Sequence, residues 1–170
     1  PLAGPLAVAG CILTKQVKGL NDSKKLTEKQ RERLFEEIVS ASKYHIALFD
    51  AKEIDSNGLS SCIKSGLLQI KSALSADKYI FDGNSKFGVS EIETMIKADT
   101  QVQEVMAASI LAKVTRDKIM LELDLIYPAY GFAAHKGYGT AAHIEAIRTH
   151  GLSAAHRESF KPKKLQPTLF

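Results

Sequence analysis

Apolar residues recur along the chain in two patterns: short continuous runs, and longer stretches at helical spacing. Runs over residues 5–14, 44–49 and 78–82 predict strands, because a strand buried on both faces carries apolar side chains at successive positions. Residues 94–98 predict one further short strand. Strands that are joined partly by a long polar loop and partly by helices define an α/β fold with a mixed sheet.

Stretches with apolar residues three or four positions apart predict the helices. Thr27 stands three residues before Gln30, the spacing of a capping box, so a helix begins there. Pro128 ends the longest helix, because proline lacks the N–H that a helix interior requires. The predicted helices begin at Thr27 and cover residues 57–75, 90–93, 104–126 and 141–150.

The bulk composition fits one globular domain over residues 1–170. Hydrophobic residues make up 45% of the chain and charged residues 25%, which is enough for a core and too apolar for a disordered chain. Cys11 and Cys62 lack the density of a disulfide framework and the spacing of a zinc site, so we interpret them as reduced core thiols. Residues 161–170 are expected to form an irregular basic tail.

Location and charge narrow the function only slightly. Apolar runs fall far short of the ~18 residues that a membrane span needs and no secretory signal opens the chain, so we expect a soluble cytoplasmic monomer with no membrane partner. Lys and Arg number 23 against 19 Asp and Glu, a formal net charge of +4. This charge suits a polyanionic partner, but an excess of this size is common among ordinary enzymes.

Asp82 and Asp99 share a sequence context, since each closes a short apolar run and precedes a turn or a helix start. Ligand sites in α/β sheets gather at the carboxyl ends of strands, so the two acids could face one another across neighbouring strands. Their oxygens suit Mg²⁺ or Mn²⁺, and two such ions can activate water for phosphodiester cleavage. A second interpretation stays open, because aspartates are also frequent turn and helix-cap residues.

Tyr138 lies in a loop between two glycines, where it belongs to no helical or strand stripe. With Lys136 nearby, its ring could stack on a base or a sugar, or could simply cover the edge of the sheet. His135 and His156 could shuttle protons or bind metal, although a lone loop histidine more often makes a simple hydrogen bond.

Lys24 and Lys25 precede the first predicted helix and could hold phosphate together with the N–H groups of its first turn. They could equally be solvated loop charges. Lys113 and Asp117 lie four residues apart on the longest predicted helix, the spacing of an ordinary surface ion pair. None of these charges identifies a function by itself.

Six short strings, taken together and in this order, resemble bacterial ribonuclease HII. Each string alone is weak, but the ordered set covers residues 1–162 and is highly specific. The strings are PLAGP at 1–5, NDSKKL at 21–26, FDGN at 81–84, AASILAKVTRD at 107–117, YGFAAHKGYGT at 130–140 and HRESFKP at 156–162.

The resemblance implies a ribonuclease H-like fold, with a five-stranded mixed sheet flanked by helices and a helical C-terminal part. It implies an endonuclease that cuts RNA within RNA/DNA hybrids, or on the 5′ side of a single ribonucleotide embedded in duplex DNA. Such cleavage leaves 3′-hydroxyl and 5′-phosphate ends. The family uses four carboxylates with Mg²⁺ or Mn²⁺, of which the third matches Asp82 and the fourth matches Asp99.

The same resemblance implies nucleic-acid contacts. Tyr138 matches the tyrosine that family members place against the sugar next to the RNA-to-DNA junction, and Lys24 and Lys25 match phosphate contacts. The 2′-hydroxyl is the group that lets such a protein distinguish RNA from DNA. We also expect contacts from neighbours in the same strings, namely Ser23, Lys113 and Lys136.

The chain departs from the family at its start. Relatives carry Asp-Glu-Ala-Gly-Arg-Gly immediately before PLAGP, a segment that supplies the first two carboxylates, the glycine-arginine-glycine contact to the junction and the central strand. Without that strand we expect two half-sheets with unpaired buried backbone groups, each costing about 1 to 3 kcal/mol. We therefore expect the natural protein to have an upstream segment, and the 170 residues alone to be inactive.

Two other functions and one partner stay open. A non-catalytic nucleic-acid-binding remnant would keep Tyr138 and the lysines without a metal centre. A different metal-dependent phosphohydrolase would act on small phosphates without a hybrid. The string QPTLF, from Gln166 to Phe170, resembles short peptides that bind a replication sliding clamp, although such pentapeptides also arise by chance.

Overall fold

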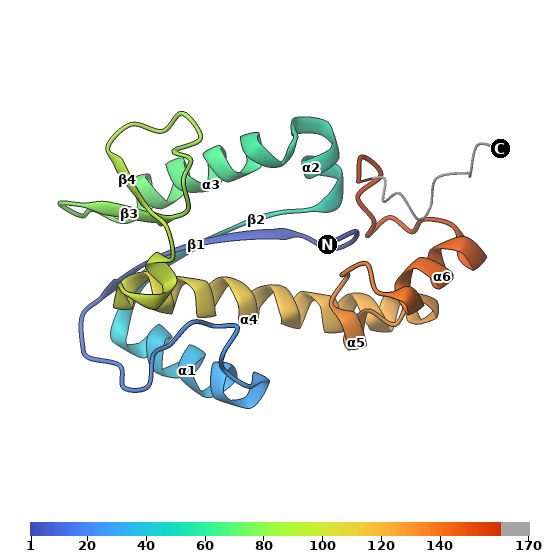
Figure 1. Cartoon of the computed structure of the whole chain (residues 1–170), viewed down its shortest axis with the longest axis horizontal. Helices are drawn as coiled ribbons and strands as arrows, with labels where there is room; N and C mark the ends of the chain where they lie inside the picture. The colour runs from blue at the N-terminus through green and yellow to red at the C-terminus, as the bar shows by residue number, and fades with distance from the viewer. Residues whose placement is uncertain (161–170) are drawn as a thin grey trace. The chain divides into compact units, whose positions relative to one another are not determined.

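The computed structural model describes residues 1–160 (Figure 1). Helices and strands are interspersed along this part of the chain, with two short 3-10 helices, η1 and η2, among them. In chain order they are β1 (Leu6–Leu13), α1 (Glu28–Ala41), β2 (Ser42–Phe49), α2 (Ala51–Asn57), α3 (Leu59–Ala73), β3 (Tyr79–Asp82), β4 (Ile92–Met95), η1 (Ala98–Thr100), α4 (Gln103–Ile126), η2 (Pro128–Tyr130), α5 (Phe132–His135) and α6 (Ala141–His150).

The chain divides into two compact units, which are described separately below. The acid unit comprises Ala7–Leu48 and Ser60–Thr115, and contains both predicted metal-binding aspartates. The tyrosine unit comprises Pro1–Leu6, Phe49–Leu59 and the chain from Arg116 onward, and contains Tyr138. The expected single domain over residues 1–170 stays a prediction.

Four strands make up two separate two-stranded sheets in the described part of the chain. In one sheet β1 pairs with β2, and the end of β1 lies beside the start of β2, where Thr14 N donates to Ala41 O at 2.8 Å. In the other, β3 and β4 are parallel, and Asp82 is in register with Met95. The five-stranded sheet implied by the resemblance is therefore represented here by two pairs of strands.

The core of the acid unit is built by two helices whose apolar stripes were visible in the sequence. On α1 the capping box between Thr27 and Gln30 is formed as predicted, and Leu34 and Ile38 are 1% and 0% exposed. They pack in one cluster with buried residues of the first half of α4, among them Ile110. Helical spacing therefore predicted this core correctly.

Two predicted elements need correction. The predicted helix over residues 90–93 is wrong, because residues 92–95 form β4, and the strand predicted over 94–98 ends at Met95. The helix predicted over 57–75 is confirmed as α3, Leu59–Ala73, whereas α2, which ends before Gly58 at φ +80°, was not predicted. Asp99 therefore does not close a strand but lies on η1.

Two further expectations can be compared with the structure. Cys11 and Cys62 are free, and Cys62 is buried, as expected for core thiols. None of the helices in residues 1–160 combines the length and the apolar character that crossing a membrane would require.

Candidate active site

Asp82 closes β3, as predicted, and its carboxylate is held by the backbone of η1. Ala98 N donates to Asp82 Oδ1 at 2.9 Å, so the carboxylate points toward the segment that carries Asp99. The end of β3, which carries Asp82, and η1, which carries Asp99, thus lie close together. Asp99 was expected at the end of a strand and lies on a 3-10 helix instead.

Asp99 is 6% exposed and pairs with a cation from a distant part of the sequence. Lys24 Nζ lies 3.4 Å from Asp99 Oδ2, and the lysine side chain is 79% exposed. The hydrogen bond to Asp99 and its negative charge raise the pKa of Lys24, and Asp82 adds a smaller effect of the same sign. Lys24 therefore interacts electrostatically with both carboxylates.

A left-handed residue sets the position of Asp99. Lys97 adopts φ +60°, a conformation that favours glycine, and its carbonyl accepts from Thr100 N at 3.1 Å and from Thr100 Oγ1 at 2.8 Å. This turn ends the extended backbone of β4 and begins η1. Because no glycine marks the turn, the sequence pattern suggested a strand running on toward Asp99.

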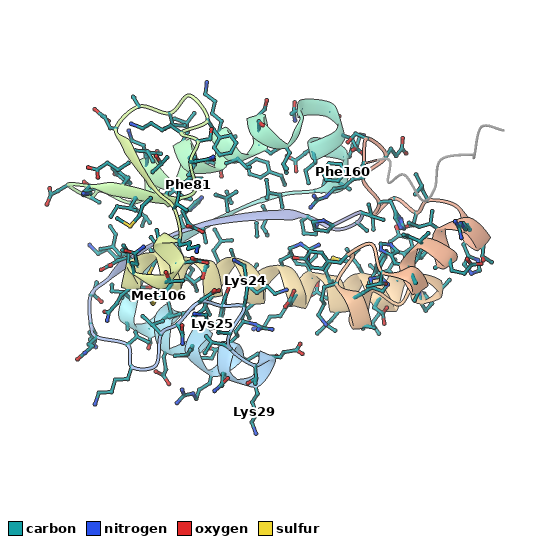
Figure 2. All side chains as sticks on the ribbon, viewed as in Figure 1. Lys24, Lys25, Lys29, Phe81, Met106 and Phe160 are labelled. Atoms are coloured by element: carbon teal, nitrogen blue, oxygen red, sulfur yellow. The ribbon has the colours of Figure 1, made fainter. Side chains whose placement is uncertain are left out.

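Lys24 lies in the loop before α1, where hydrogen bonds fix the backbone turn that carries it (Figure 2). Asp22 Oδ1 accepts from Lys24 N at 2.9 Å, and Asp22 O accepts from Lys25 N at 2.9 Å. Arg31 Nη1 donates to Ser23 O at 3.1 Å and to Leu26 O at 2.5 Å, so a helix side chain holds the loop on both sides of the lysine pair.

The remaining predicted nucleic-acid contacts of the acid unit differ in exposure. Lys25 is exposed and Lys113, on α4, is half-buried, whereas Ser23 is only 7% exposed and presents little side-chain surface. Asp117, predicted to form a surface pair with Lys113, is itself only 7% exposed and so does not lie on the surface. Among these predicted contacts Lys24 and Lys25 are the exposed cations, and Lys24 is the one that contacts an acid, Asp99.

Asp82 and Asp99 fit a hard divalent cation but do not complete a ligand set. Carboxylate oxygens are the donors that Mg²⁺ and Mn²⁺ prefer, and Asp99 already faces a cation in Lys24. Within residues 1–160, no group of three or more His, Cys, Asp or Glu side chains gathers to hold a metal ion.

Tyr138 lies in the tyrosine unit, 49% exposed, on a loop whose backbone is held on both sides. Tyr138 N donates to His135 O at 2.9 Å, and Gly137 O accepts from Leu2 N at 2.7 Å. The Arg116 guanidinium lies 5.5 Å from the centre of the Tyr138 ring. The ring is therefore exposed, as predicted, and in contact with a buried cation. Lys136, also predicted to bind nucleic acid, donates to Ala133 O at 2.5 Å.

Two buried arginines that the sequence analysis overlooked hold the first residues of the chain. Arg116 donates through Nε to Pro5 O and through Nη2 to Ala3 O, both at 3.1 Å. Arg157 donates through Nε to Gly4 O at 3.0 Å and through Nη2 to Pro5 O at 3.1 Å. Both arginines lie inside the strings VTRD and HRESF, but nothing in their spacing indicates contacts to residues more than a hundred positions away.

The fold, together with the two aspartates near the end of β3, places the protein in the class of ribonuclease H-like α/β proteins. RNase HII from Archaeoglobus fulgidus, solved in a PCNA:RNase HII complex, matches with a TM-score of 0.77 at 24% identity and covers 99% of this chain and 93% of its own. Bst-RNase HIII, solved in complex with Mn²⁺, matches at 0.68 with 17% identity, covering 94% of this chain and 63% of its own. At these identities the likeness shows the fold alone.

The sequence comparisons go further. The family model for ribonuclease HII matches residues 1–163. A ribonuclease HII of Sulfurovum sp. (strain NBC37-1) is 56% identical over 171 aligned positions, which cover 100% of this chain and 91% of that protein. The chain belongs to the ribonuclease HII family of metal-dependent endoribonucleases, as the ordered strings predicted.

Proposed function

We propose that the protein cleaves the RNA strand of RNA/DNA hybrids and incises on the 5′ side of single ribonucleotides in duplex DNA, acting in the cytoplasm. The observation that carries this proposal is the meeting of Asp82, Asp99 and Lys24 in the acid unit of a ribonuclease HII family member. Two carboxylates beside an accessible lysine suit a phosphodiester that must be held near divalent ions.

In the proposed mechanism Asp82 and Asp99 hold divalent metal together with an Asp-Glu pair such as relatives carry before PLAGP. When bound, two such ions favour deprotonation of the attacking water and stabilise the charge that develops on the leaving 3′ oxygen. The Ala98 N–H fixes the direction of the Asp82 carboxylate. Lys24, which is exposed and cationic, binds a phosphate of the substrate strand.

Tyr138 has the second proposed role. Its exposed ring stacks on the sugar beside the RNA-to-DNA junction, while the 2′-hydroxyl distinguishes RNA from DNA. Lys25, Lys113, Lys136 and the Ser23 turn add contacts along the backbone of the duplex. The metal is proposed to be Mg²⁺ or Mn²⁺, and the structural neighbour Bst-RNase HIII was solved with Mn²⁺.

The test uses a chain in which Asp-Glu-Ala-Gly-Arg-Gly is placed before Pro1. We expect this chain to cleave an RNA/DNA hybrid and Asp82→Asn in it to lose cleavage while keeping hybrid affinity. The amide oxygen of asparagine can still accept from Ala98 N–H, so the fold is preserved. Asp77→Asn, at an exposed site shortly before β3, is the matched control and keeps full activity.

Each rival has its own outcome in this assay. Turnover by Asp82→Asn would overturn the assignment of the site. Hybrid binding without any cleavage by the extended chain would favour the non-catalytic remnant, and cleavage of nucleotides without a hybrid would favour a small-phosphate hydrolase. For the 170 residues alone we expect binding without cleavage.

We further propose a sliding clamp as partner, bound through Gln166–Phe170, a segment that lies outside the described residues. The support is the QPTLF string together with the complex in which the Archaeoglobus fulgidus neighbour was solved with PCNA. Deleting residues 166–170 should abolish binding to a purified clamp and leave hybrid affinity unchanged. Equal clamp affinity with and without the segment would end this proposal.

A further inference from the structure

Two buried histidines form a direct contact behind the Tyr138 loop. His143, on α6, is 0% exposed, and His156, in the turn after α6, is 3% exposed. Their Nε2 atoms lie 3.0 Å apart, a hydrogen bond that needs one ring to donate and the other to accept. The pair lies in the tyrosine unit and plays no part in the mechanism given above.

The partner of His143 fixes its tautomer. Its Nδ1 lies 2.9 Å from the Tyr138 carbonyl oxygen, and since a carbonyl can only accept, Nδ1 carries the proton. In the neutral ring Nε2 is then an acceptor, so the proton in the Nε2–Nε2 contact belongs to His156.

His156 meets the same requirement independently. Ser153 N donates to its Nδ1 at 2.9 Å, and the Ser153 hydroxyl lies 2.8 Å from the same atom, so Nδ1 is unprotonated and Nε2 carries the proton. Donation therefore runs in one direction, from Ser153 N–H to His156, from His156 to His143, and from His143 to the Tyr138 carbonyl. The partners at the two ends of this chain of hydrogen bonds, Ser153 and the Tyr138 carbonyl, thus require the same pair of tautomers. We call this chain of hydrogen bonds the relay.

The third ring of the cluster is tied to the same loop. His135 Nε2 donates to Tyr130 O at 2.9 Å, and its Nδ1 accepts from Gly137 N at 3.2 Å. The His135 ring stacks on His143, with centroids 4.3 Å apart and planes 15° from parallel. The residue before Tyr138 and the carbonyl of Tyr138 itself are thus both held by neutral imidazoles.

We propose that His143 and His156 are positioning residues for Tyr138: their relay of hydrogen bonds fixes the Tyr138 carbonyl and so the direction in which its ring leaves the loop. This inference rests on the proposed contact between Tyr138 and the substrate sugar. The pair acts through Tyr138 and touches neither substrate nor metal. It explains why a half-exposed aromatic side chain on a glycine-flanked loop is anchored by buried polar groups.

The relay works only while both rings are neutral. A second proton on His143 Nε2 would face the proton of His156, and one on His156 Nδ1 would face the Ser153 N–H. Burial lowers the pKa of both histidines, and that of His156 to about 4.

The charged and titratable groups around the pair act in the same direction. His135 on α5 lowers the pKa of both histidines, and the amino group of Pro1 lowers that of His143. Arg157, which follows His156 in the chain, is a cation and offers no counter-charge. Aromatic rings, Tyr130 of η2 at 4.8 Å and Phe132 of α5 at 5.5 Å, cover His156 without offering a counter-charge. The surroundings therefore favour the neutral form of both rings at neutral pH.

Nitrogen-detected NMR of the 170-residue chain tests the relay directly. At neutral pH we expect His143 protonated on Nδ1 and His156 on Nε2, with the Tyr138 ring and amide signals shifting only when His156 takes up its second proton in acid. The opposite tautomers, or Tyr138 signals that ignore the protonation of His156, would overturn the proposal.

A matched pair of substitutions separates positioning from folding. His143→Asn puts an amide N–H where Nδ1 was and keeps the donor to the Tyr138 carbonyl, whereas His143→Gln puts it near Nε2 and loses that donor. In EDTA, the Asn variant should bind an RNA/DNA hybrid like the parent, and the Gln variant about tenfold more weakly, the equivalent of one hydrogen bond. Equal affinity of the two variants, whether both high or both low, would overturn the proposal.

Tyr138→Ala separates this inference from the proposed function. Weakened hybrid binding by Tyr138→Ala supports the sugar contact on which positioning depends. If Tyr138→Ala binds like the parent, the proposed role of Tyr138 is wrong and the positioning role is overturned with it, while the NMR result still reports whether the relay exists.

Discussion

The acid unit and the tyrosine unit hold their functional side chains in opposite ways. In the acid unit Asp99 meets one exposed lysine at 3.4 Å, and Asp82 accepts one backbone N–H. In the tyrosine unit the Tyr138 loop and residues 1–5 are held by buried arginines and histidines with several hydrogen bonds each. The two carboxylates thus have few protein partners, whereas the backbone of the Tyr138 loop is fixed by buried side chains.

The largest expected effect comes from cutting the arginine contacts of the tyrosine unit. Arg157→Ala would leave the Gly4 carbonyl without its arginine donor and the Pro5 carbonyl with only Arg116 Nε, and the loss of these two buried, charge-assisted hydrogen bonds should lower the free energy of unfolding by about 4 kcal/mol. Arg148→Ala, which removes an exposed arginine paired to Glu145 at 3.5 Å, should cost less than about 0.5 kcal/mol. Urea unfolding measures both, and equal losses would contradict the claim that buried arginine contacts hold the tyrosine unit together.

Acid should weaken the same network. The pKa of His156 falls from 6.5 to about 4 on folding, so the unfolded chain takes up the proton first. Stability is fully present above pH 6.5 and is lost as the pH falls toward 4, by on the order of 2 to 3 kcal/mol. In His156→Gln the loss between neutral pH and about pH 4.5 should be clearly smaller than in the parent. An unchanged pH slope in urea unfolding would argue against a buried neutral His156.

A glycine tests how closely the loop fits. A Cβ at Gly137, where φ is +77°, would lie 2.4 Å from Ala3 O, whereas a Cβ at Gly151, where φ is +76°, meets nothing within 4 Å. Both alanine variants bear the cost of a left-handed conformation, about 1 to 2 kcal/mol, but only Gly137→Ala adds a backbone clash. We expect Gly137→Ala to lose about 2 kcal/mol more than Gly151→Ala in thermal or urea unfolding. Equal losses would show that the loop can shift away from residues 1–5.

The smallest effect on stability is expected at the acid site. Lys24→Met removes an exposed ion pair, and should change the free energy of unfolding by less than about 0.5 kcal/mol. The substitution should instead change binding, because losing one phosphate contact reduces the slope of log affinity against log salt concentration by about one. Fluorescence anisotropy at several salt concentrations measures this slope. An unchanged slope would remove Lys24 from the phosphate contacts.

The two units also differ in how far the sequence could predict them. Asp82 was placed correctly because its strand ends where the apolar run ends, and the core of α1 and α4 followed from helical spacing. Asp99 was assigned to a strand end because the turn that redirects the chain is made by Lys97, a residue type that gives no signal for a left-handed conformation. Local pattern therefore predicted the elements of the acid unit, but not the turn that places its second acid.

The tyrosine unit depends on contacts that local pattern cannot express. Arg157 reaches Gly4 across 153 positions, and His143 meets His156 across 13 positions with no element joining them in register. Isolated polar residues add no apolar period, so the sequence showed His156 as a lone histidine and gave no sign that His143, on α6, contacts it. Local signals did predict the helix capped by Thr140, and the exposure of Tyr138, because glycines flank it and no apolar stripe includes it.

The central claim is that Asp82 and Asp99 belong to one metal site, and the direct test is Mn²⁺ binding. Calorimetry would compare Asp99→Asn with the parent, both carrying Asp-Glu-Ala-Gly-Arg-Gly before Pro1, and with Asp77→Asn as the exposed control of equal charge. The account predicts Mn²⁺ affinity at least about tenfold weaker for Asp99→Asn and unchanged for Asp77→Asn. Equal affinity of Asp99→Asn and the parent would contradict it.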